Sequence, residues 1–438
     1  MRLVDKRVKL NRYSLKILLN YEHQYIYIRQ MKSKKTFVLL TALCIALVLS
    51  AQQRQQNVEN VFTKTLINFD PSTNPDGLNN KDSIIFIGNG RIALKKVKLP
   101  NFTNNTELTA KITLVSNGDP WDKSGSCFII PNESDISMLD IAKGIKTYPT
   151  VVSSQYENLT GIVQGPGYKP TVELMRFMTP FGVGHFSADD NELSAKRKPV
   201  YIDGWAKNVV WEEDISDLLP LFENEVYVGI FIDTWTKDGY VIDLEIVYNE
   251  SKLSCDIKTA KHVEPLINTV YYIGQKHPDI FARKNVDVPF TIPSGAKNVQ
   301  LKYITTGHGG HSGGDEFRPQ ENILSINGKE VYSFTPWRTD CASFRRFNPS
   351  TGVWLRERTV AYIGRGGRAE KEIEEPIASS DLSRSNWCPG SYVPPVVISL
   401  KDIEAGKHVL SISIPDSKEI DGEKLNHWLV SAYLTWEE

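Results

Sequence analysis

The sequence has almost no excess charge, and this absence removes two classes of partner. The chain of 438 residues holds 51 Lys and Arg against 52 Asp and Glu, which gives a formal net charge of −1. Nucleic acids and acidic membranes attract basic surfaces, so the balance gives no electrostatic reason to expect either one. Glycans, peptides and other weakly charged ligands remain possible partners.

Compact metal-binding motifs are also missing. No pair of cysteines has CxxC spacing and no HExxH segment occurs, so the usual zinc arrangements are not indicated. His308, His311, Asp315 and Glu316 are all of ligand type and lie within ten positions of one another. They lack the helical spacing that fixes ligand geometry, and a solvated loop is the simpler interpretation. We therefore expect neither a metal nor an organic cofactor.

The longest apolar run is too short to span a membrane and has the pattern of a secretory signal. It follows a basic stretch and precedes a small-residue cleavage site, and a true span needs about 20 apolar residues. We expect residues 1–51 to be a leader, with translation starting at Met31 and an exported, periplasmic or secreted product without stable membrane insertion. The pattern consists of Lys32, Lys34, Lys35, Phe37–Leu49, Ser50 and Ala51.

Cysteine is scarce in the mature chain. Removing the leader leaves Cys127, Cys255, Cys341 and Cys388. In an exported protein an even number permits disulfides, but four cysteines allow three pairings and their spacing does not choose among them.

Long amphipathic helix patterns are absent, and the clearest apolar patterns have period two instead. Such alternation is typical of antiparallel strands with one buried and one solvated face. Apolar residues alternate in this way over 108–114, 242–248, 299–303 and 410–414. Short helical turns are expected only at Ile215–Leu219 and Asp135–Lys143. The mature chain is therefore predicted to be all-β.

A chain of this length usually forms two domains. The polar run Asn249–Lys252 follows a clear strand pattern, so we place the domains at residues 57–252 and 256–438. Residues 132–170 are predicted to be a long excursion between strands.

Four segments interrupt the strand patterns and place charge beside tryptophan or glycine. An indole can stack on a sugar ring while a neighbouring carboxylate binds hydroxyls or moves protons, so these segments are candidates for a sugar site. Taken singly, each is more often a core tryptophan beside a turn acid. The segments are Ser116–Asp122, Asp233–Trp235, Gly307–Phe317 and Arg384–Gly390.

Taken together and in order, the segments resemble the bacterial peptide:N-glycosidase F family. Trp121-Asp122 is similar to the family's Trp-Asp pair, and Arg176 to Phe181 to its Arg-Phe-hydrophobic-Thr-Pro-aromatic block. Asp233-Thr234-Trp235 stands where the family has Glu-Thr-Trp, and Glu316-Phe317 where it has Glu-Trp. Arg384 to Gly390 is similar to an Arg-x-x-Trp-Cys-Pro-Gly block. The resemblance covers most of the mature chain.

The resemblance implies two side-by-side eight-stranded antiparallel jelly-roll sandwich domains with a site between them. Asp122, Glu316 and Asp233 would be the catalytic carboxylates of an amidase that releases N-linked glycans from glycoproteins and glycopeptides. We expect it to act as a monomer. The residues that would bind substrate are Trp121, Lys123, Met178, Trp235, His308, Arg384 and Trp387. The resemblance also implies a Cys341–Cys388 disulfide around the polar stretch Arg356–Glu375, with Cys127 and Cys255 left as free thiols.

Several residues depart from the family pattern. Asp233 is one methylene shorter than the family's glutamate, Lys123 replaces an arginine, and His308 and Phe317 stand where the family has tryptophans. Two other functions therefore remain open. One is a non-catalytic glycan-binding protein, because jelly rolls are common lectin scaffolds. The other is a glycosidase in which Asp122 and Glu316 act on a bond between sugars.

Overall fold

The computed structural model describes residues 57–73, 79–81, 83–150, 159–182, 204–252, 261–275, 279–309, 314–351, 353–420 and 425–438. All of them belong to one compact unit, Asn57–Glu438. The predicted leader and signal peptide lie outside the described residues, as do Cys255 and His311. No helix in the described part of the chain is long and apolar enough to cross a membrane.

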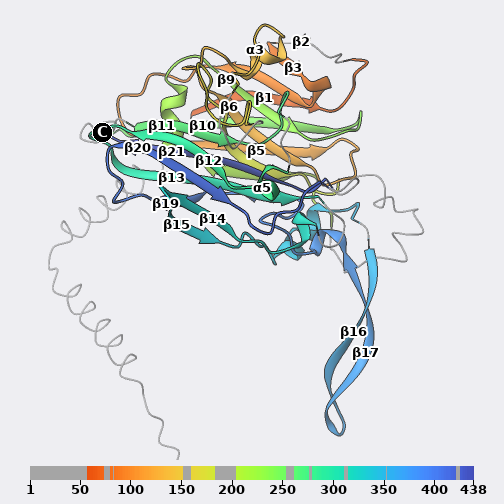
Figure 1. Cartoon of the computed structure of the whole chain (residues 1–438). Coiled ribbons are helices and arrows are strands. Elements are labelled where there is room, and N and C mark those ends of the chain that lie inside the picture. Colours follow the sequence, from red (N-terminus) through yellow and green to blue (C-terminus); the bar gives the residue numbers. More distant parts are fainter. Residues whose placement is uncertain are drawn as a thin grey trace, which may run out of the picture. The chain divides into compact units, whose positions relative to one another are not determined.

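The N-terminal half is an antiparallel β-sandwich (Figure 1). One sheet has four strands in the order β1-β10-β5-β8, and the facing sheet has seven in the order β18-β7-β6-β9-β4-β3-β2. The first sheet consists of β1 (Asn57–Ile67), β10 (Tyr240–Glu250), β5 (Thr106–Ser116) and β8 (Val209–Asp214). The second consists of β18 (Tyr392–Val393), β7 (Val172–Met178), β6 (Ser124–Ile130), β9 (Val226–Ile232), β4 (Ile92–Val97), β3 (Ile84–Ile87) and β2 (Asn79–Lys81).

The C-terminal half is a second antiparallel sandwich of two four-stranded sheets. Their orders are β11-β21-β13-β19 and β12-β20-β14-β15. The first holds β11 (Lys261–Asn268), β21 (His427–Glu437), β13 (Lys297–His308) and β19 (Val396–Ser399). The second holds β12 (Val286–Ile292), β20 (Gly406–Ser413), β14 (Asn322–Ile326) and β15 (Lys329–Phe334). The predicted pair of antiparallel sandwiches is confirmed, with four and four described strands here and some additional short strands in the N-terminal half.

The period-two patterns correctly predicted these strands, because alternate side chains of a strand point to opposite faces of its sheet. Leu108, Ala110, Ile112 and Leu114 are all buried on β5, as the alternation predicts. Each fully buried aliphatic side chain contributes about 1.5–3 kcal/mol, so a one-residue slip of β5 would cost several such terms at once.

Helices are few and short among the described residues. They are α3 (Met138–Ala142), α5 (Ile280–Arg283) and the 3-10 turns η1 (Gly88–Gly90), η2 (Ser216–Phe222), η3 (Asp315–Phe317), η4 (Cys341–Phe347) and η5 (Ser379–Asp381). Ser137 and Asp140 form a capping box at the start of α3. Both predicted helical turns are therefore confirmed, at α3 and η2.

The two halves share a strand and a buried ion pair. The short β18, from the C-terminal part of the chain, pairs with β7 of the N-terminal half. On β7, Arg176 pairs with Glu173 and also donates to the Leu429 carbonyl oxygen and, at 3.3 Å, to Thr306 Oγ1. The exposed fraction of Arg176 is 1%. These contacts hold β7 of one half against β13 and β21 of the other, and the candidate site lies at this junction.

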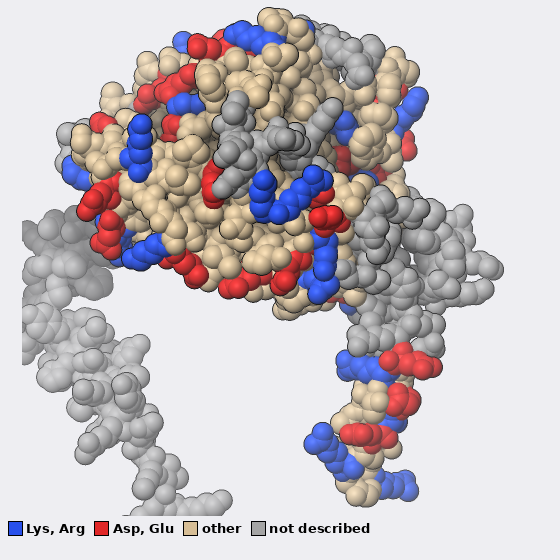
Figure 2. Space-filling model, viewed as in Figure 1, with Lys and Arg blue, Asp and Glu red and all other residues tan. Residues whose placement is uncertain are grey.

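The polar stretch Arg356–Glu375 lies in a regular hairpin. β16 (Val353–Gly364) pairs with β17 (Gly367–Ala378) along its whole length, from Val353↔Ala378 to Gly364↔Gly367. The hairpin extends away from the sandwiches in Figure 1, and Figure 2 shows acidic and basic side chains along it. Backbone hydrogen bonds between the two strands supply the order that apolar packing does not.

Candidate active site

The candidate site is built from loops of both halves that meet around one arginine. Arg384, which precedes β18, donates from Nε to Glu316 Oε1 at 2.8 Å. Its Nη2 lies 3.6 Å from Asp122 Oδ2. Asp122 follows β5 of the N-terminal half, and Glu316 lies in η3 of the C-terminal half. The structure thus brings together two of the three predicted catalytic carboxylates, which are 194 positions apart in the sequence.

Burial changes the proton affinity of both carboxyl groups. It raises the pKa of Glu316 to about 7, with Arg384 opposing the shift and the Asp122 charge adding to it. Burial also raises the pKa of Asp122, against the positive charges of Arg384 and Lys123. The side chain of Asp122 is still 16% exposed and that of Glu316 is 17% exposed, so a ligand can reach them. A carboxyl pair of this kind can hold one proton near neutral pH.

Arg384 itself is buried, with 1% of its side chain exposed. Its guanidinium lies 4.9 Å from the Trp387 ring centroid and 5.1 Å from that of Phe317. Its Nη1 donates to the carbonyl oxygens of Ser379 and Leu382, each at 3.0 Å. A guanidinium is planar, so it can stack on rings and donate hydrogen bonds in five fixed directions, which an ammonium cannot do. A lysine therefore could not replace Arg384 here.

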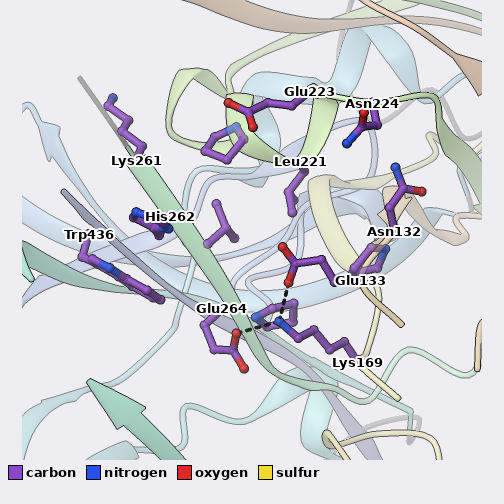
Figure 3. A pocket seen from close by; sticks show the side chains of 14 residues that line it. Asn132, Glu133, Lys169, Leu221, Glu223, Asn224, Lys261, His262, Glu264 and Trp436 are labelled. Carbon is purple, nitrogen blue, oxygen red and sulfur yellow. Dashed lines mark hydrogen bonds and ion pairs between the residues drawn. The ribbon is translucent and has the colours of Figure 1, made fainter. Parts of the chain in front are cut away.

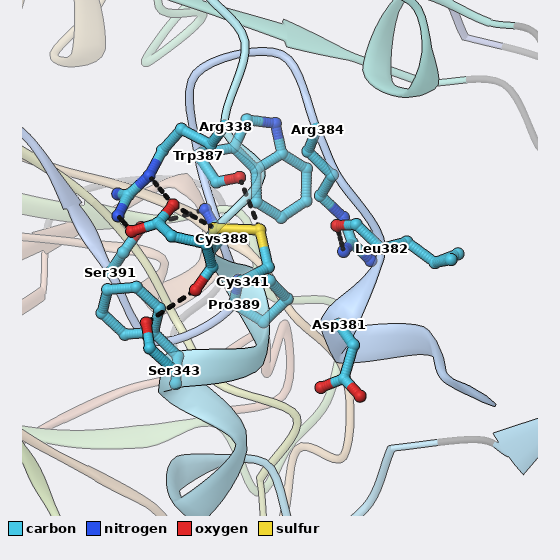
Figure 4. The surroundings of a disulfide bond; sticks show 12 residues. Arg338, Cys341, Ser343, Asp381, Leu382, Arg384, Trp387, Cys388, Pro389 and Ser391 are labelled. Carbon is cyan, nitrogen blue, oxygen red and sulfur yellow. Dashed lines mark hydrogen bonds and ion pairs between the residues drawn. A yellow bond between two sulfur atoms is a disulfide. The ribbon is translucent and has the colours of Figure 1, made fainter. Parts of the chain in front are cut away.

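The Cys341–Cys388 disulfide lies beside this arginine (Figure 4). It is present as the resemblance implied, and it joins η4 to the segment that carries Arg384 and Trp387. Arg338, just before η4, exchanges backbone hydrogen bonds with Arg384 at 2.9 and 3.2 Å. The cross-link and this bridge together fix the backbone on which the guanidinium is placed. Cys127 is a free, buried thiol, as expected.

Asp233, the third predicted carboxylate, lies at the end of β9 next to the Asp122 loop. Its backbone N–H donates to the Ser124 carbonyl oxygen at 3.0 Å. Its carboxylate accepts from Tyr271 Oη at 2.8 Å and from Trp235 Nε1 at 3.1 Å, and Arg91 Nη1 lies 3.5 Å away. Burial raises the pKa of Asp233, while the Tyr271 hydrogen bond and the Arg91 charge lower it.

Two of the predicted substrate-binding tryptophans are open to solvent. Trp121 is 53% exposed and Trp235 is 57% exposed, unusually high values for indoles in loops that are otherwise well anchored. The Arg91 guanidinium stacks on the Trp235 ring at 4.3 Å, and Phe69 packs against the same ring. Exposed indoles held in a fixed orientation are suited to stacking on sugar rings.

Lys123 lies between Asp122 and Ser124, and its charge lowers the pKa of both Asp122 and Asp233. Its backbone N–H donates to Thr179 Oγ1 at 2.7 Å, and its carbonyl oxygen accepts from the Thr179 N–H at 2.9 Å. Thr179 therefore holds the Lys123 backbone in place, and the Lys123 ammonium is close enough to act electrostatically on Asp122 and Asp233.

Burial corrects the prediction for Met178. This side chain is 1% exposed and packs with Ile304, Trp387 and Val393 in a small core cluster. It cannot touch a substrate there, because it comes at the buried end of β7. Trp387 is 4% exposed and donates from Nε1 to the Gly307 carbonyl oxygen at 2.8 Å. It therefore supports Arg384 from beneath and does not offer a face to a ligand.

His308 is also mostly buried, between two other rings. It stacks on Trp387 with ring centroids 5.5 Å apart and on His427 at 5.1 Å. Burial lowers the pKa of His308 well below its usual value, and the neighbouring His427 and Arg176 lower it further. His308 thus belongs to a column of rings that runs beneath the site.

Sequence reasoning missed four residues that shape the site. Asp119 is fully buried, accepts from the Trp121 N–H at 3.0 Å and from Thr234 Oγ1 at 2.6 Å, and so ties the two tryptophan loops together. Arg91, Tyr271 and His427 reach the site from other elements. Asp119 lay inside a singled-out segment, whereas the other three sit in ordinary strand or loop contexts and carried no signal of their own.

His308, Asp315 and Glu316, the described ligand-type residues of the Gly307–Phe317 segment, do not gather around a metal position. Asp315 accepts from Gln320 Nε2 at 2.8 Å and from the Lys418 N–H at 3.0 Å, and Glu316 pairs with Arg384. Among the residues that the structure describes, no group of three or more His, Cys, Asp or Glu side chains could hold a metal ion.

A separate pocket of about 610 Å³ lies where η2 and the start of β11 meet (Figure 3). Its charged groups are largely paired with one another, as Lys169 Nζ is with Glu133 and Glu264, both at 2.9 Å. His262 stacks on Trp436 in its wall, with ring centroids 5.3 Å apart. His262 and Trp436 lie on the paired strands β11 and β21, at the end of β21 opposite His427. This pocket is therefore distinct from the carboxylate site.

Fold and site together define a class of protein, in which two antiparallel β-sandwiches carry a carboxylate–arginine site at their junction. Comparisons with known proteins agree. Models of peptide-N-glycosidase F match twice, the N-terminal model over residues 58–248 and the C-terminal model over residues 276–435. The chain belongs to the peptide-N-glycosidase F family, a family of amidases.

Solved structures give the same result. One crystal form of PNGF-II is 35% identical with a TM-score of 0.72, and the match covers 88% of this chain and 66% of that one. A second form is 34% identical with a TM-score of 0.71, covering 90% and 68%. PNGase F, a glycosylasparaginase from Flavobacterium meningosepticum, is 14% identical with a TM-score of 0.53, covering 88% and 96%, which shows a shared fold. The chain thus spans about two thirds of the PNGF-II chains. A comparison with curated proteins found no match.

Proposed function

We propose that this chain is an exported peptide:N-glycosidase that hydrolyses the amide bond between the innermost N-acetylglucosamine and the asparagine of N-glycoproteins and glycopeptides. The observation that carries the proposal is the Asp122–Arg384–Glu316 arrangement, in which an arginine contacts two partly accessible carboxyl groups of raised pKa. Family membership supports the reaction class, and the exposed Trp121 and Trp235 support a sugar ligand.

The proposed chemistry needs a base, an acid and a group that stabilises negative charge. An unactivated amide resists water, so one carboxylate takes a proton from the attacking water while the oxygen adds to the amide carbon. Arg384 stabilises the negative charge that develops on the amide oxygen. The C–N bond then breaks, and a protonated carboxyl group gives its proton to the departing nitrogen.

The products follow from that balance. The peptide keeps an aspartate where the asparagine was, and the glycan leaves as a glycosylamine, which later loses ammonia in water. We assign the central role to Asp122, with Glu316 as the second essential carboxyl group and Asp233 as the group that orients water or a substrate hydroxyl.

Product analysis of one glycopeptide tests the proposal. The peptide is incubated with the protein and its mass is measured against a control without protein. Conversion of the glycosylated asparagine to aspartate supports the proposed amidase. An unchanged glycopeptide would indicate a glycan-binding protein, and a peptide that retains a sugar stump would indicate a glycosidase; either result contradicts the proposal.

A further inference from the structure

His427 and His308 face each other across two neighbouring strands. They are directly paired in the register of β13 and β21, and their rings stack at 5.1 Å with an interplanar angle of 19°. On the far side of His308 the Trp387 ring follows, and on the far side of His427 the Tyr271 ring follows at 5.7 Å. A continuous column of four rings thus links the Arg384 position to Asp233, since Trp387 lies under Arg384 and Tyr271 donates to Asp233.

Hydrogen-bond directions determine which nitrogen of His427 carries the proton. Its Nδ1 lies 2.6 Å from the carbonyl oxygen of Leu425. A carbonyl oxygen can only accept, so Nδ1 must be the protonated nitrogen. In the neutral ring Nε2 is then an acceptor, and no described residue provides a donor to it. His427 is half-buried, and its Nε2 is not among the buried side-chain atoms that lack a hydrogen-bond partner in the described part of the chain.

The neighbouring His308 is held in the same form by Thr306. The Arg176 guanidinium can only donate, and its Nη1 does so to Thr306 Oγ1 at 3.3 Å. The threonine hydroxyl is then free to give its own proton to His308 Nε2, 2.7 Å away. If the hydroxyl gives its proton in this way, His308 accepts on Nε2 and carries its own proton on Nδ1.

Charge around the column favours two neutral rings. A protonated His308 would lie between Arg176 and His427, which both lower its pKa in addition to burial. Burial lowers the pKa of His427, while the Leu425 hydrogen bond and the Asp233 charge oppose that shift. The other charged groups at this end, Arg91 and Lys123, act on Asp233 and partly offset its charge. Both imidazoles are thus uncharged at neutral pH.

We propose that His427 is a further substrate-binding residue, which accepts a hydrogen bond from a sugar hydroxyl through its unprotonated Nε2. His308 acts as a positioning residue that fixes the His427 ring by stacking. The inference rests on the proposed function, because a saccharide is the ligand that brings hydroxyl donors to this position.

Binding measurements with conservative variants test the acceptor. All are made in an Asp122→Asn background, so that a synthetic glycopeptide with one N-linked glycan stays intact during calorimetry. His427→Asn keeps a donor for the Leu425 carbonyl but removes the Nε2 acceptor, and we expect roughly tenfold weaker binding, the effect of about one lost hydrogen bond. His427→Gln places an amide oxygen near the Nε2 position and should bind within about threefold of the parent.

The matched control is His408→Asn, which changes another stacked histidine. His408 lies on β20, in the other sheet of the C-terminal sandwich, and packs on Phe290. It should bind like the parent. Unchanged binding by His427→Asn, or an equal loss in His427→Gln, would overturn the proposal.

Nitrogen NMR of the histidine rings near pH 7.5 is a readout independent of any substrate. We expect protonated Nδ1 and unprotonated Nε2 at both His308 and His427, and a protonated Nε2 at His427 would overturn the inference. If the parent protein neither binds nor converts the glycopeptide, the proposed function fails and the substrate contact falls with it. The ring spectra would still show whether His427 offers an acceptor.

Discussion

Arg384 is the residue on which the most site contacts converge. It contacts Glu316 and Asp122, stacks on Trp387 and Phe317, and donates to two backbone carbonyl oxygens. Because a buried guanidinium keeps its charge under all ordinary conditions, it lowers the cost of holding negative charge on either carboxyl group. The pKa values of Asp122 and Glu316 are therefore set jointly, and a change at one should be felt at the other.

Asp122→Asn should abolish glycan release and leave the fold intact. The amide has nearly the same shape as the carboxylate but cannot take up a proton, so we expect activity to fall by at least two orders of magnitude. Release from a glycopeptide is measured by mass spectrometry, with the melting temperature as a control for folding. Turnover above roughly a few per cent of the wild-type value would exclude an acid or base role.

Glu316 should titrate near pH 7, so the enzyme's activity should change with pH around this value. Its pKa is raised to about 7 by burial, so it is mostly protonated below that pH and mostly ionised above it. Burial also raises the pKa of Glu213 to about 7, and this residue lines a different pocket, together with Lys302 and Tyr433. In carbon NMR of labelled glutamate, Glu316→Gln and Glu213→Gln should each remove one resonance that titrates there. Only Glu316→Gln should greatly reduce activity, and equal losses in both variants would contradict this assignment.

Asp233 should tolerate a longer side chain better than no carboxylate. It accepts hydrogen bonds from Tyr271 and Trp235, which hold it in place at the end of β9. We expect Asp233→Glu to keep most of the activity and Asp233→Ala to lose roughly tenfold or more in kcat/KM, since the alanine leaves Tyr271 without its acceptor. Steady-state kinetics on one glycopeptide give the answer. An alanine variant with wild-type kinetics would reduce Asp233 to a structural turn residue.

At the scale of the elements, the site depends on strand ends that are tied to one another. β5 and β9 belong to different sheets of the N-terminal sandwich, yet Asp119 after β5 bonds Thr234 after β9. Tyr240 at the start of β10 donates to the Trp121 carbonyl oxygen at 2.5 Å, and Thr179 after β7 holds Lys123. Four strand ends thus position a short acidic loop without a helix.

The Cys341–Cys388 disulfide should be needed to place Arg384. It spans 47 positions in sequence and encloses the whole β16–β17 hairpin. A cross-link of this span contributes roughly 4 kcal/mol in the chain-entropy model. Non-reduced peptide mapping should find the linked peptides, and mild reduction should lower activity before the N-terminal sandwich unfolds. If both thiols could be alkylated in the native protein, the prediction would be wrong.

A double variant, Cys341→Ser with Cys388→Ser, shows whether a loss of activity comes from losing this disulfide or from other effects of the reductant. Cys127, which is free and buried, is unchanged in it. We expect this double variant to lose activity under non-reducing conditions and to respond no further to a reductant. Cys127→Ser is the matched control and should keep the wild type's response to reduction.

At the scale of the whole molecule, the two sandwiches are joined by a buried charge pair. Arg176 and Glu173 are almost fully buried, and Arg176 also bonds Leu429 and Thr306 of the other half. Removing one partner of such a pair leaves the other charge buried alone, which usually costs about 3–5 kcal/mol. The junction that carries the site thus depends on keeping both partners.

Arg176→Met should therefore lower the free energy of unfolding by about 3–5 kcal/mol. Replacing both partners, as Arg176→Met with Glu173→Gln, should recover part of that loss because no isolated charge remains. Chemical denaturation followed by fluorescence measures these two variants and Glu173→Gln alone. If the double variant were as unstable as the sum of the two single variants, the charges would not act as a pair.

The strand patterns were predictable because they depend on local periodicity. Over β5 the alternation of Leu108, Ala110, Ile112 and Leu114 needs only a buried face on one side of a sheet, whatever the partner strands are. The same holds for the short helical turn at α3, where Ser137 and Asp140 satisfy each other locally. The hairpin β16–β17 was missed because its order comes from backbone pairing between strands and not from an apolar face.

The candidate site, like the fold, could be predicted only in part from the sequence. Sequence by itself indicated the three carboxylates, Trp121, Trp235 and Arg384 as candidates, because these residues stand in recognisable order within a family pattern. Only the tertiary structure decided that Met178 is buried, that Asp119 ties two loops together, and that His427, Tyr271 and Arg91 reach the site. Several of those contacts join segments more than a hundred positions apart, such as Asp119 with Thr234 and Arg91 with Asp233. Packing across the sandwiches brings such residues together, which local patterns cannot predict.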